Sequence, residues 1–162
     1  MHLEGFIKIM WMFSKATEYA LRATIYIAQK STGEKKLGLV EIAKAIDSPK
    51  SFTAKILQLL TKGNGIISST TGPGGGFYLE EAKKKLPVRA VLEAVGEDEV
   101  ITKCILGLRE CSDSKPCPMH ARYKIIKQQL IQLFETKTIQ DLADEISKGK
   151  LFIKNNRRRA AK

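Results

Sequence analysis

Three cysteines and a histidine lie close together in the second half of the chain. Cys104, Cys111 and Cys117 are the three cysteines of the 162-residue sequence, and His120 follows just after the last of them. Thiolates and imidazole are soft ligands that suit zinc or an iron–sulfur cluster. The residues around Cys111 and Cys117 are polar or charged, which is not the pattern of thiols buried in a core. The segment therefore predicts metal or redox chemistry rather than inert thiols.

The residues alone leave three kinds of cysteine chemistry open. Zinc accepts the same ligands as an iron–sulfur cluster, although the sequence has no Cys-x-x-Cys pair of the kind that zinc knuckles use. A direct thiol switch is the third alternative, because clustered cysteines in a reducing compartment more often serve metal or redox chemistry than structural disulfides.

The chain is strongly basic. It has 28 Lys and Arg against 17 Asp and Glu, a net charge of +11, and an isoelectric point near 9.6. This balance favours a polyanionic partner, with nucleic acid before a membrane surface. No apolar run is long enough to span a bilayer, and residues 1–11 make a poor signal peptide because they carry an acid and no small-residue cleavage site. We therefore expect a cytoplasmic protein that does not bind membranes.

The first half of the chain has the pattern of a winged helix. A helix is predicted at 14–30, with Ser14 as its cap and an apolar stripe that includes Ala20, Ala23 and Ile27. A second helix is predicted at 39–46, and a third runs from Pro49 through Leu60, with Ser48 as its N-cap. Two β-prone runs then flank the glycine-rich turn at 72–76, which predicts a hairpin. A helix-turn-helix followed by a hairpin is a winged helix, whose third helix enters the major groove of DNA while the wing lies on the backbone or in the minor groove.

The second half is mostly helical. We expect a helix at 86–95, a loop at 97–118, a long helix at 119–134, and a last short helix that Thr138 and Asp141 open as a capping box. The long helix has an apolar stripe that a twofold partner would cover, formed by Tyr123, Ile126, Leu130, Leu133 and Phe134. The predicted fold class is mainly α with a small β-hairpin: a winged helix-turn-helix domain plus a long C-terminal dimerisation helix.

These residues resemble the IscR/NsrR/CymR family of bacterial winged-helix regulators. The run from Ser51 to Gln58 is similar to the family's recognition helix, the run from Gly72 to Phe77 to its wing, and the three cysteines to its cluster ligands. The resemblance implies a homodimer on a palindromic operator in double-stranded DNA, with an iron–sulfur cluster that controls DNA binding. A 2Fe-2S cluster is favoured and a 4Fe-4S cluster is the alternative. Some family members instead pair with a metabolic enzyme, and that partner stays open.

The resemblance also bears on the fourth cluster ligand. His120 matches the IscR-like members, in which a histidine completes a two-iron cluster. Glu18 is the rival, because it stands where the nitric-oxide-sensing members carry an acidic ligand on the first helix; otherwise it would be a solvated acid on the helix face or pair with Arg22 at the i+4 position. We favour His120 for its softness and its proximity to the cysteines. The chain departs from the family pattern in a Cys104–Cys111 spacing one residue longer than usual and in Thr71, where an arginine is common.

The expected organisation follows from these elements. It comprises an N-terminal extension (1–11), the DNA-binding domain (12–96), the cysteine-bearing cluster loop (97–118), the dimerisation helix with the final short helix (119–148), and a basic tail (149–162). The expected DNA contacts are Lys50, Ser51, Ala54, Lys55 and Gln58 on the third helix and Thr71, Gly72, Pro73, Gly74 and Gly75 in the wing.

The sequence favours a regulator over an enzyme. The glycine-rich turn is followed by Phe77 and Tyr78 rather than by the Lys and Ser or Thr of a nucleotide phosphate loop, and no nucleophile–base motif is present. The predicted function is a homodimeric DNA-binding transcriptional regulator whose operator affinity an iron–sulfur cluster controls, as a redox, nitric oxide or iron–sulfur status sensor. The alternatives are a regulator with a thiol switch or structural zinc, or one that acts through a partner metabolic enzyme.

Overall fold

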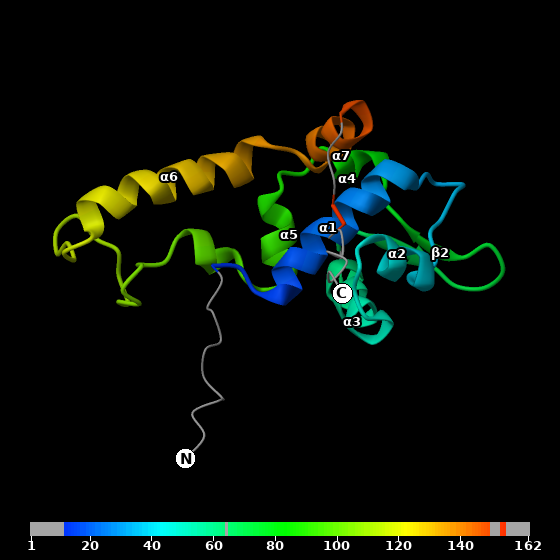
Figure 1. Cartoon of the computed structure of the whole chain (residues 1–162), viewed down its shortest axis with the longest axis horizontal. Helices are drawn as coiled ribbons and strands as arrows, with labels where there is room; N and C mark the ends of the chain where they lie inside the picture. Colours follow the sequence, from blue (N-terminus) through cyan, green and yellow to red (C-terminus); the bar gives the residue numbers. More distant parts are fainter. Residues whose placement is uncertain (1–11, 64, 150–152, 155–162) are drawn as a thin grey trace, which may run out of the picture.

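The computed structural model describes residues 12–63, 65–149 and 153–154. The predicted N-terminal extension and most of the basic tail, including Arg157, Arg158 and Arg159, lie outside these residues. A compact part holds α1 to α5 and α7, and α6 forms an arm that projects from it (Figure 1). The cysteine segment runs out to the tip of this arm, where α6 begins, and α6 leads back to the compact part.

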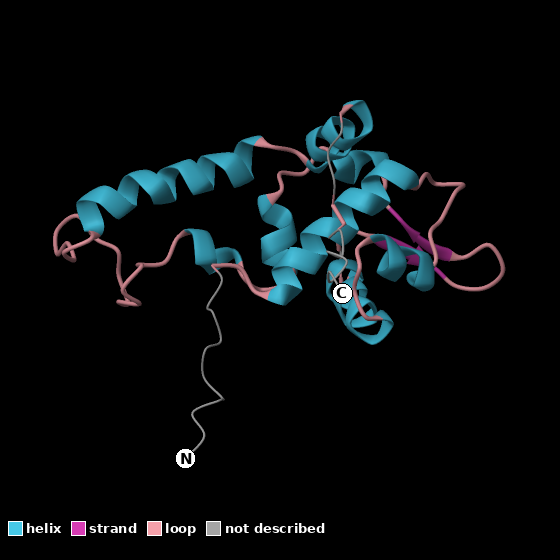
Figure 2. Cartoon of the chain, viewed as in Figure 1, coloured by secondary structure: helices cyan, strands magenta, loops and turns pink. Residues whose placement is uncertain are grey.

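The described residues are mainly helical, with one two-stranded antiparallel hairpin. The helices are α1 (Lys15–Lys30), α2 (Leu39–Ala45), α3 (Lys50–Thr61), α4 (Glu81–Lys84), α5 (Arg89–Ala94), the 3-10 helix η1 (Asp98–Ile101), α6 (His120–Thr136) and α7 (Ile139–Lys148). The strands are β1 (Ser68–Thr70) and β2 (Gly76–Tyr78), which lie beside α2 (Figure 2). The predicted fold class, mainly α with a small hairpin, is confirmed.

Helix α1 is the centre of the compact part. The hydroxyl of Ser14 caps it by accepting a hydrogen bond from the backbone N–H of Thr17 at 3.2 Å. Its apolar stripe, which includes Ala20, Ala23 and Ile27, is fully buried. The helix packs against α2, α3, α5 and α7, so one core holds the helix-turn-helix together with the C-terminal helix.

The turn between α2 and α3 differs from the prediction by one residue. Asp47 adopts φ 54°, and the N–H of Ser48 bonds to the carbonyl of Ala43 at 3.0 Å. This is a Schellman-type ending of α2, in which a residue in the left-handed region follows the last turn. Because the backbone of Ser48 completes α2, Ser48 does not cap α3, and the cap position falls on Pro49.

The wing includes a residue that precedes the helix-turn-helix. Strands β1 and β2 pair with Ser68 opposite Tyr78. The backbone N–H of Leu37 donates to the carbonyl of Phe77 at 2.9 Å, and the N–H of Phe77 donates to the carbonyl of Leu37 at 2.8 Å. Gly76 makes this close approach possible: its φ is 148°, and a Cβ there would lie 2.6 Å from the carbonyl oxygen of Leu37. The wing is thereby joined to the segment between α1 and α2.

The prediction for residues 86–95 was only partly right. Helix α5 starts at Arg89, not Leu86, because Leu86 and Val88 hydrogen-bond to the chain at the start of α7. The N–H of Ile139 donates to the carbonyl of Leu86 at 3.0 Å, and the N–H of Val88 donates to the carbonyl of Lys137 at 2.9 Å. Helix α4 and the 3-10 helix η1 were not predicted. The capping box of Thr138 and Asp141 at the start of α7 is confirmed.

A second apolar cluster holds the base of the arm. Phe134 near the end of α6 packs with Leu92 and Ile101, and its ring lies 5.6 Å from that of Phe13 between centroids. Lys127 donates to the carbonyl of Thr102 at 3.1 Å. These contacts fix α6 against η1. Because the cysteine segment connects η1 to α6, they also limit where that segment can run. None of the described helices is long and apolar enough to cross a membrane.

Candidate metal centre and DNA-binding surface

The three cysteines and His120 gather in two pairs at the start of α6. The sulfurs of Cys104 and Cys117 lie 3.9 Å apart, and the sulfur of Cys111 lies 3.5 Å from Nδ1 of His120. Cys104 is buried at 3 % exposure and His120 at 7 %, whereas Cys111 and Cys117 are half-buried. The backbone N–H of His120 donates to the carbonyl of Cys117 at 2.9 Å. This hydrogen bond closes a turn that holds one member of each pair, Cys117 and His120.

The environment of Cys104 favours its thiolate. The backbone N–H of Leu106 lowers the pKa of the Cys104 thiol; burial raises it, and the N–H of Leu108, the thiol of Cys117 and the ammonium of Lys127 lower it further. The net effect is that the pKa of Cys104 lies below its ordinary value. Hydrogen bonds from backbone amides to a cysteine sulfur also tune iron–sulfur clusters. Cys104 thus has the surroundings of a ligand or of a reactive thiol.

Asp113 is a member of this site that the sequence analysis missed. One oxygen of its carboxylate lies 2.9 Å from Nε2 of His120, and Lys124 donates to both of its oxygens at 2.7 and 2.8 Å. The hydrogen bond from Lys124, followed by the one from His120, lowers the pKa of Asp113. Spacing in the sequence gave no signal for it, because an exposed loop acid is unremarkable until α6 brings His120 and Lys124 beside it.

The described residues hold no group of three or more His, Cys, Asp or Glu side chains placed to bind one metal ion. The two pairs nevertheless match the separations of ligands on a single metal. For metal–sulfur bonds of about 2.3 Å in a tetrahedron, two thiolates lie about 3.8 Å apart, and a thiolate and an imidazole nitrogen about 3.6 Å. Both observed separations are close to these values, so each pair has the spacing of two ligands on one metal.

Glu18 lies on α1 and forms an ion pair with Lys15 at 2.6 Å. The pairing with Arg22 that we expected as its alternative role is wrong: Arg22 lies over the ring of Tyr19, 5.3 Å from its centroid, and donates to the carbonyl of Ile46. The structure brings together Cys104, Cys111, Cys117 and His120 within one segment, and it does not bring Glu18 into hydrogen-bond contact with them.

The expected DNA contacts gather on α3 and the wing. On α3, Lys50, Ser51, Lys55 and Gln58 are exposed and Ala54 is half-buried. In the wing, Thr71, Gly72, Pro73 and Gly74 are exposed and Gly75 is half-buried. The first turn of α3 contains no acidic residue. The partial positive charge at the N-terminus of the helix therefore adds to the positive charge of its lysines. The exposed lysines give this surface positive charge, which phosphate contacts need.

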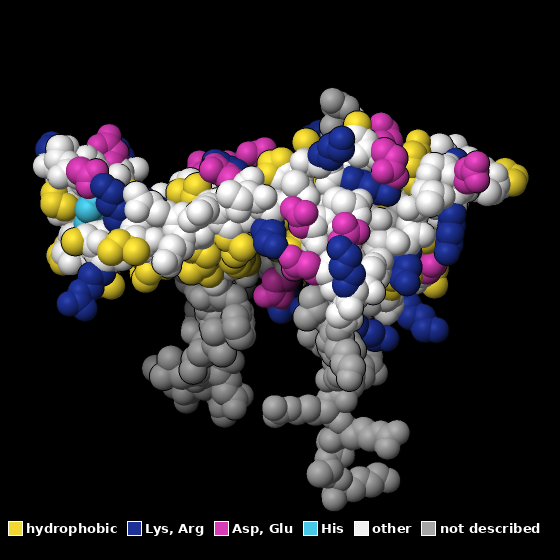
Figure 3. Space-filling view, turned by 90° about the horizontal axis from the view of Figure 1, so that it is seen from above, with side chains coloured by type: hydrophobic (Ala, Val, Ile, Leu, Met, Phe, Trp, Pro, Cys, Tyr) yellow, Lys and Arg dark blue, Asp and Glu magenta, His cyan; other side chains and the backbone are white. Residues whose placement is uncertain are grey.

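The apolar stripe of α6 is divided between two roles. Tyr123 and Phe134 are buried within the chain, Leu130 is half-buried, and Ile126 and Leu133 are about half exposed, at 50 % and 52 %. Figure 3 shows hydrophobic side chains gathered along one edge of the arm, with a histidine at its tip. Ile125 is a further exposed apolar side chain of α6, at 59 %. The exposed part is what a second copy of the chain could cover.

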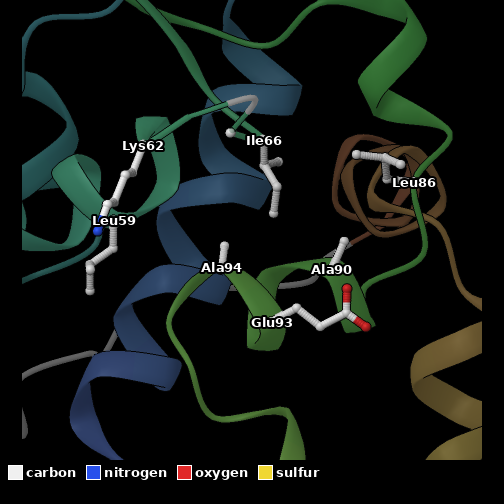
Figure 4. A pocket seen from close by; sticks show the side chains of 8 residues that line it. Leu59, Lys62, Ile66, Leu86, Ala90, Glu93 and Ala94 are labelled. Carbon is white, nitrogen blue, oxygen red and sulfur yellow. The ribbon is translucent and has the colours of Figure 1, made fainter.

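A separate cavity of about 360 Å³ lies between the end of α3 and α5. Polar and apolar surface line it in similar measure, and the charged side chains of Lys62 and Glu93 lie on opposite sides of it (Figure 4). It contains none of the predicted ligand or DNA-contact residues.

Comparisons with known proteins match most of the chain. The family model Rrf2, described as an iron-dependent transcriptional regulator, matches residues 13–145. A protein of Aquifex aeolicus strain VF5, named as an HTH-type transcriptional regulator, is 32 % identical over 133 residues, which cover 81 % of this chain and 90 % of the relative. The HTH-type transcriptional regulator IscR of Erwinia tasmaniensis is 29 % identical over 126 residues, covering 78 % of this chain and 74 % of that protein.

Solved structures show the same fold. CymR, the global cysteine regulator of B. subtilis, superposes with a TM-score of 0.64 at 20 % identity, covering 83 % of this chain and 98 % of that one. IscR of T. potens superposes with a TM-score of 0.65 at 16 % identity, covering 88 % and 93 %.

Proposed function

The chain belongs to the Rrf2 family of iron-dependent transcriptional regulators, and on that premise we propose that its DNA affinity is controlled by an iron–sulfur cluster held by Cys104, Cys111, Cys117 and His120. As a member of this family it is a transcriptional regulator and not an enzyme. The observation that carries the proposal is the pairing of Cys104 with Cys117 and of Cys111 with His120, at 3.9 and 3.5 Å.

The pairing supports a 2Fe-2S cluster over a zinc ion. Each iron of a two-iron cluster takes two protein ligands, which corresponds to two pairs, whereas structural zinc needs four ligands around one point. The described residues offer two pairs and no group of three. The cluster, when bound, would supply the redox and ligand-exchange chemistry; the protein supplies three sulfurs, one imidazole and a largely buried Cys104 that limits solvent access.

We propose that DNA binding uses two copies of the chain. The exposed side chains of Ile125, Ile126 and Leu133 on α6 would pack against the same surface of a second copy. Two copies related by a twofold axis present two α3 helices, which calls for a palindromic operator with half-sites in successive major grooves. The family's role in transcription and the charge of +11 support a cytoplasmic location with the chromosome.

The test is spectroscopic. Protein purified without oxygen should be brown, with visible absorption and about equal amounts of iron and acid-labile sulfide. Binding to a DNA library should change when the cluster is removed with a chelator. Colourless protein that contains zinc, or no metal, and binds DNA equally well before and after chelation would overturn the proposal.

A second candidate function is favoured by one specific contact. The sulfurs of Cys104 and Cys117 lie 3.9 Å apart, against about 2.05 Å in a disulfide bond, and the pKa of Cys104 is lowered. In this alternative, peroxide oxidises the two thiols of the iron-free protein to a disulfide, releasing two waters. Mass spectrometry of the iron-free protein after peroxide treatment distinguishes it, because a Cys104–Cys117 disulfide lowers the mass by two hydrogens.

A further inference from the structure

Asp113 joins the cysteine loop to the first two turns of α6. Its carboxylate lies 2.9 Å from Nε2 of His120 and accepts hydrogen bonds from Lys124 at 2.7 and 2.8 Å. His120 and Lys124 are one helical turn apart, so they present their nitrogens on the same face of α6. A single loop residue therefore contacts the one histidine of the predicted ligand set.

We propose that Asp113 positions His120 for cluster binding by holding the tautomer that carries its proton on Nε2. An ionised carboxylate can only accept hydrogen bonds, so the contact at 2.9 Å requires that Nε2 donate. In a neutral imidazole the lone pair is then on Nδ1, the nitrogen that lies 3.5 Å from the sulfur of Cys111. The imidazole thus points its metal-binding atom toward Cys111. This inference rests on the proposed function.

The burial of the two partners supports this assignment. The His120 side chain is 9 % exposed and the Asp113 side chain 73 % exposed, so the histidine is held inside while the acid reaches it from solvent. The exposed acid has an anchor in Lys124, whose ammonium contacts both carboxylate oxygens. Metal-binding imidazoles commonly donate their other N–H to a carboxylate, which orients the ring and makes the ligating nitrogen more basic. Here Asp113 provides that carboxylate for His120.

The first test uses the iron-free full-length chain and does not depend on cluster loading. The sequence has two histidines, so a His2→Gln background leaves His120 as the one imidazole in a ¹⁵N NMR spectrum. We expect wild-type His120 to show the Nε2–H tautomer and Asp113→Ala to show a mixture of tautomers. Glu110→Ala, which removes another exposed acid from the same loop, is the matched control and should leave the tautomer unchanged. An Nδ1–H tautomer in the wild type, or no change in Asp113→Ala, would overturn the inference.

The second test uses the cluster. With histidine labelled selectively at Nδ1, pulsed EPR of the reduced cluster should detect a directly bound ¹⁵Nδ1. Loss of this kind of partner typically lowers metal affinity about 10- to 100-fold, so Asp113→Ala should retain iron more weakly by that factor. Asp113→Asn keeps an acceptor for Nε2–H but loses the charge, and we expect it to keep the Nδ1 coupling with an altered reduction potential. A bound Nε2 would overturn the inference.

The two tests separate the inference from the function on which it rests. A wild-type protein that shows the Nε2–H tautomer but never loads iron overturns the proposed cluster and leaves the Asp113–His120 geometry supported. A cluster that loads while Asp113→Ala keeps the wild-type tautomer, Nδ1 coupling and iron affinity supports the cluster and overturns the role of Asp113.

Discussion

The carboxylate of Glu97 accepts hydrogen bonds from the hydroxyl of Ser14 at 2.5 and 2.7 Å. The hydroxyl of Thr17 donates to the same carboxylate. Ser14 is the N-cap of α1, and Glu97 lies between α5 and η1, where the chain leaves the compact part toward the cysteines. The start of the central helix and the start of the cysteine segment are thereby joined through one acid.

We expect this acid to make stability depend on pH. Burial alone would raise the pKa of Glu97, but the hydrogen bonds from Ser14 and Thr17 outweigh it, and the pKa is lowered. Stability from a lowered carboxyl pKa is present above the pKa of the unfolded chain and is lost as pH falls through the folded value. Glu97→Gln should therefore cost about 1 kcal/mol at pH 7, after allowance for solvent screening, and the difference from wild type should shrink below about pH 4.

Urea unfolding at pH 7 and at pH 3.5 measures this difference. Glu99→Gln, which removes a nearby exposed acid, is the control and should change stability little at either pH. A Glu97→Gln deficit of the same size at both pH values would show that the carboxylate charge is not the cause.

Iron loading should depend on all three cysteines and on His120, and not on Glu18. Serine at position 104, 111 or 117 replaces a thiolate with a poor ligand and should abolish or sharply reduce iron and sulfide content. His120→Ala should destabilise the cluster, while Glu18→Ala removes an ion pair on α1 and should leave loading normal. Iron and sulfide analysis with visible spectra gives the answer. Normal loading in His120→Ala with loss in Glu18→Ala would move the fourth ligand to α1.

Dimerisation should fail when charge is placed on the exposed surface of α6. Ile126 and Leu133 are each about half exposed, so Ile126→Asp with Leu133→Asp should leave the folded chain intact and yield monomers. Val40→Asp, at another exposed apolar position (61 % exposed), is the control. Sedimentation or light scattering reports the mass. A double variant with undiminished dimer mass would show that another surface carries the contact.

Recognition by α3 should separate into base reading and phosphate positioning. Ser51 and Lys55 are exposed on α3, and loss of either should change base preference by about 1–3 kcal/mol at one operator position. Lys50→Ala should weaken all sequences alike and make the salt dependence shallower by about one unit. Competition binding to a randomised operator library at two salt concentrations checks both. Uniform weakening by Ser51→Ala and Lys55→Ala would transfer specificity to the wing.

The wing should tolerate no side chain at Gly76. A Cβ there would meet the carbonyl oxygen of Leu37 at 2.6 Å, in a backbone conformation (φ 148°) that other residues rarely adopt, so Gly76→Ala should displace the hairpin and weaken DNA binding. Gly33→Ala, with nothing within 4 Å of the added Cβ, is the matched control. Thermal unfolding and DNA affinity measure the effect. An unchanged affinity in Gly76→Ala would mean that the wing contributes little.

Local patterns in the sequence were enough for most of the helices. Ser14 as the cap of α1, the capping box at Thr138, the glycine-rich turn of the hairpin and the stripe on α1 all depend on residues within a few positions of each other, so short-range rules apply to them. The one-residue error at Ser48 came from Asp47, whose left-handed φ allows the chain to close α2 first. The bounds of α5 were wrong because Leu86 and Val88 bond to a segment distant in sequence.

The sequence by itself determined which residue types could bind a metal: three thiols and an imidazole in one segment, beside a winged helix. Only the tertiary structure decided how they pair, Cys104 with Cys117 and Cys111 with His120. It also decided that Phe134 packs inward and that Asp113 reaches the imidazole. The physical reason is that ligand identity is local chemistry, whereas pairing depends on where η1 and α6 hold the two ends of the cysteine segment, and apolar contacts between distant parts of the chain set that position.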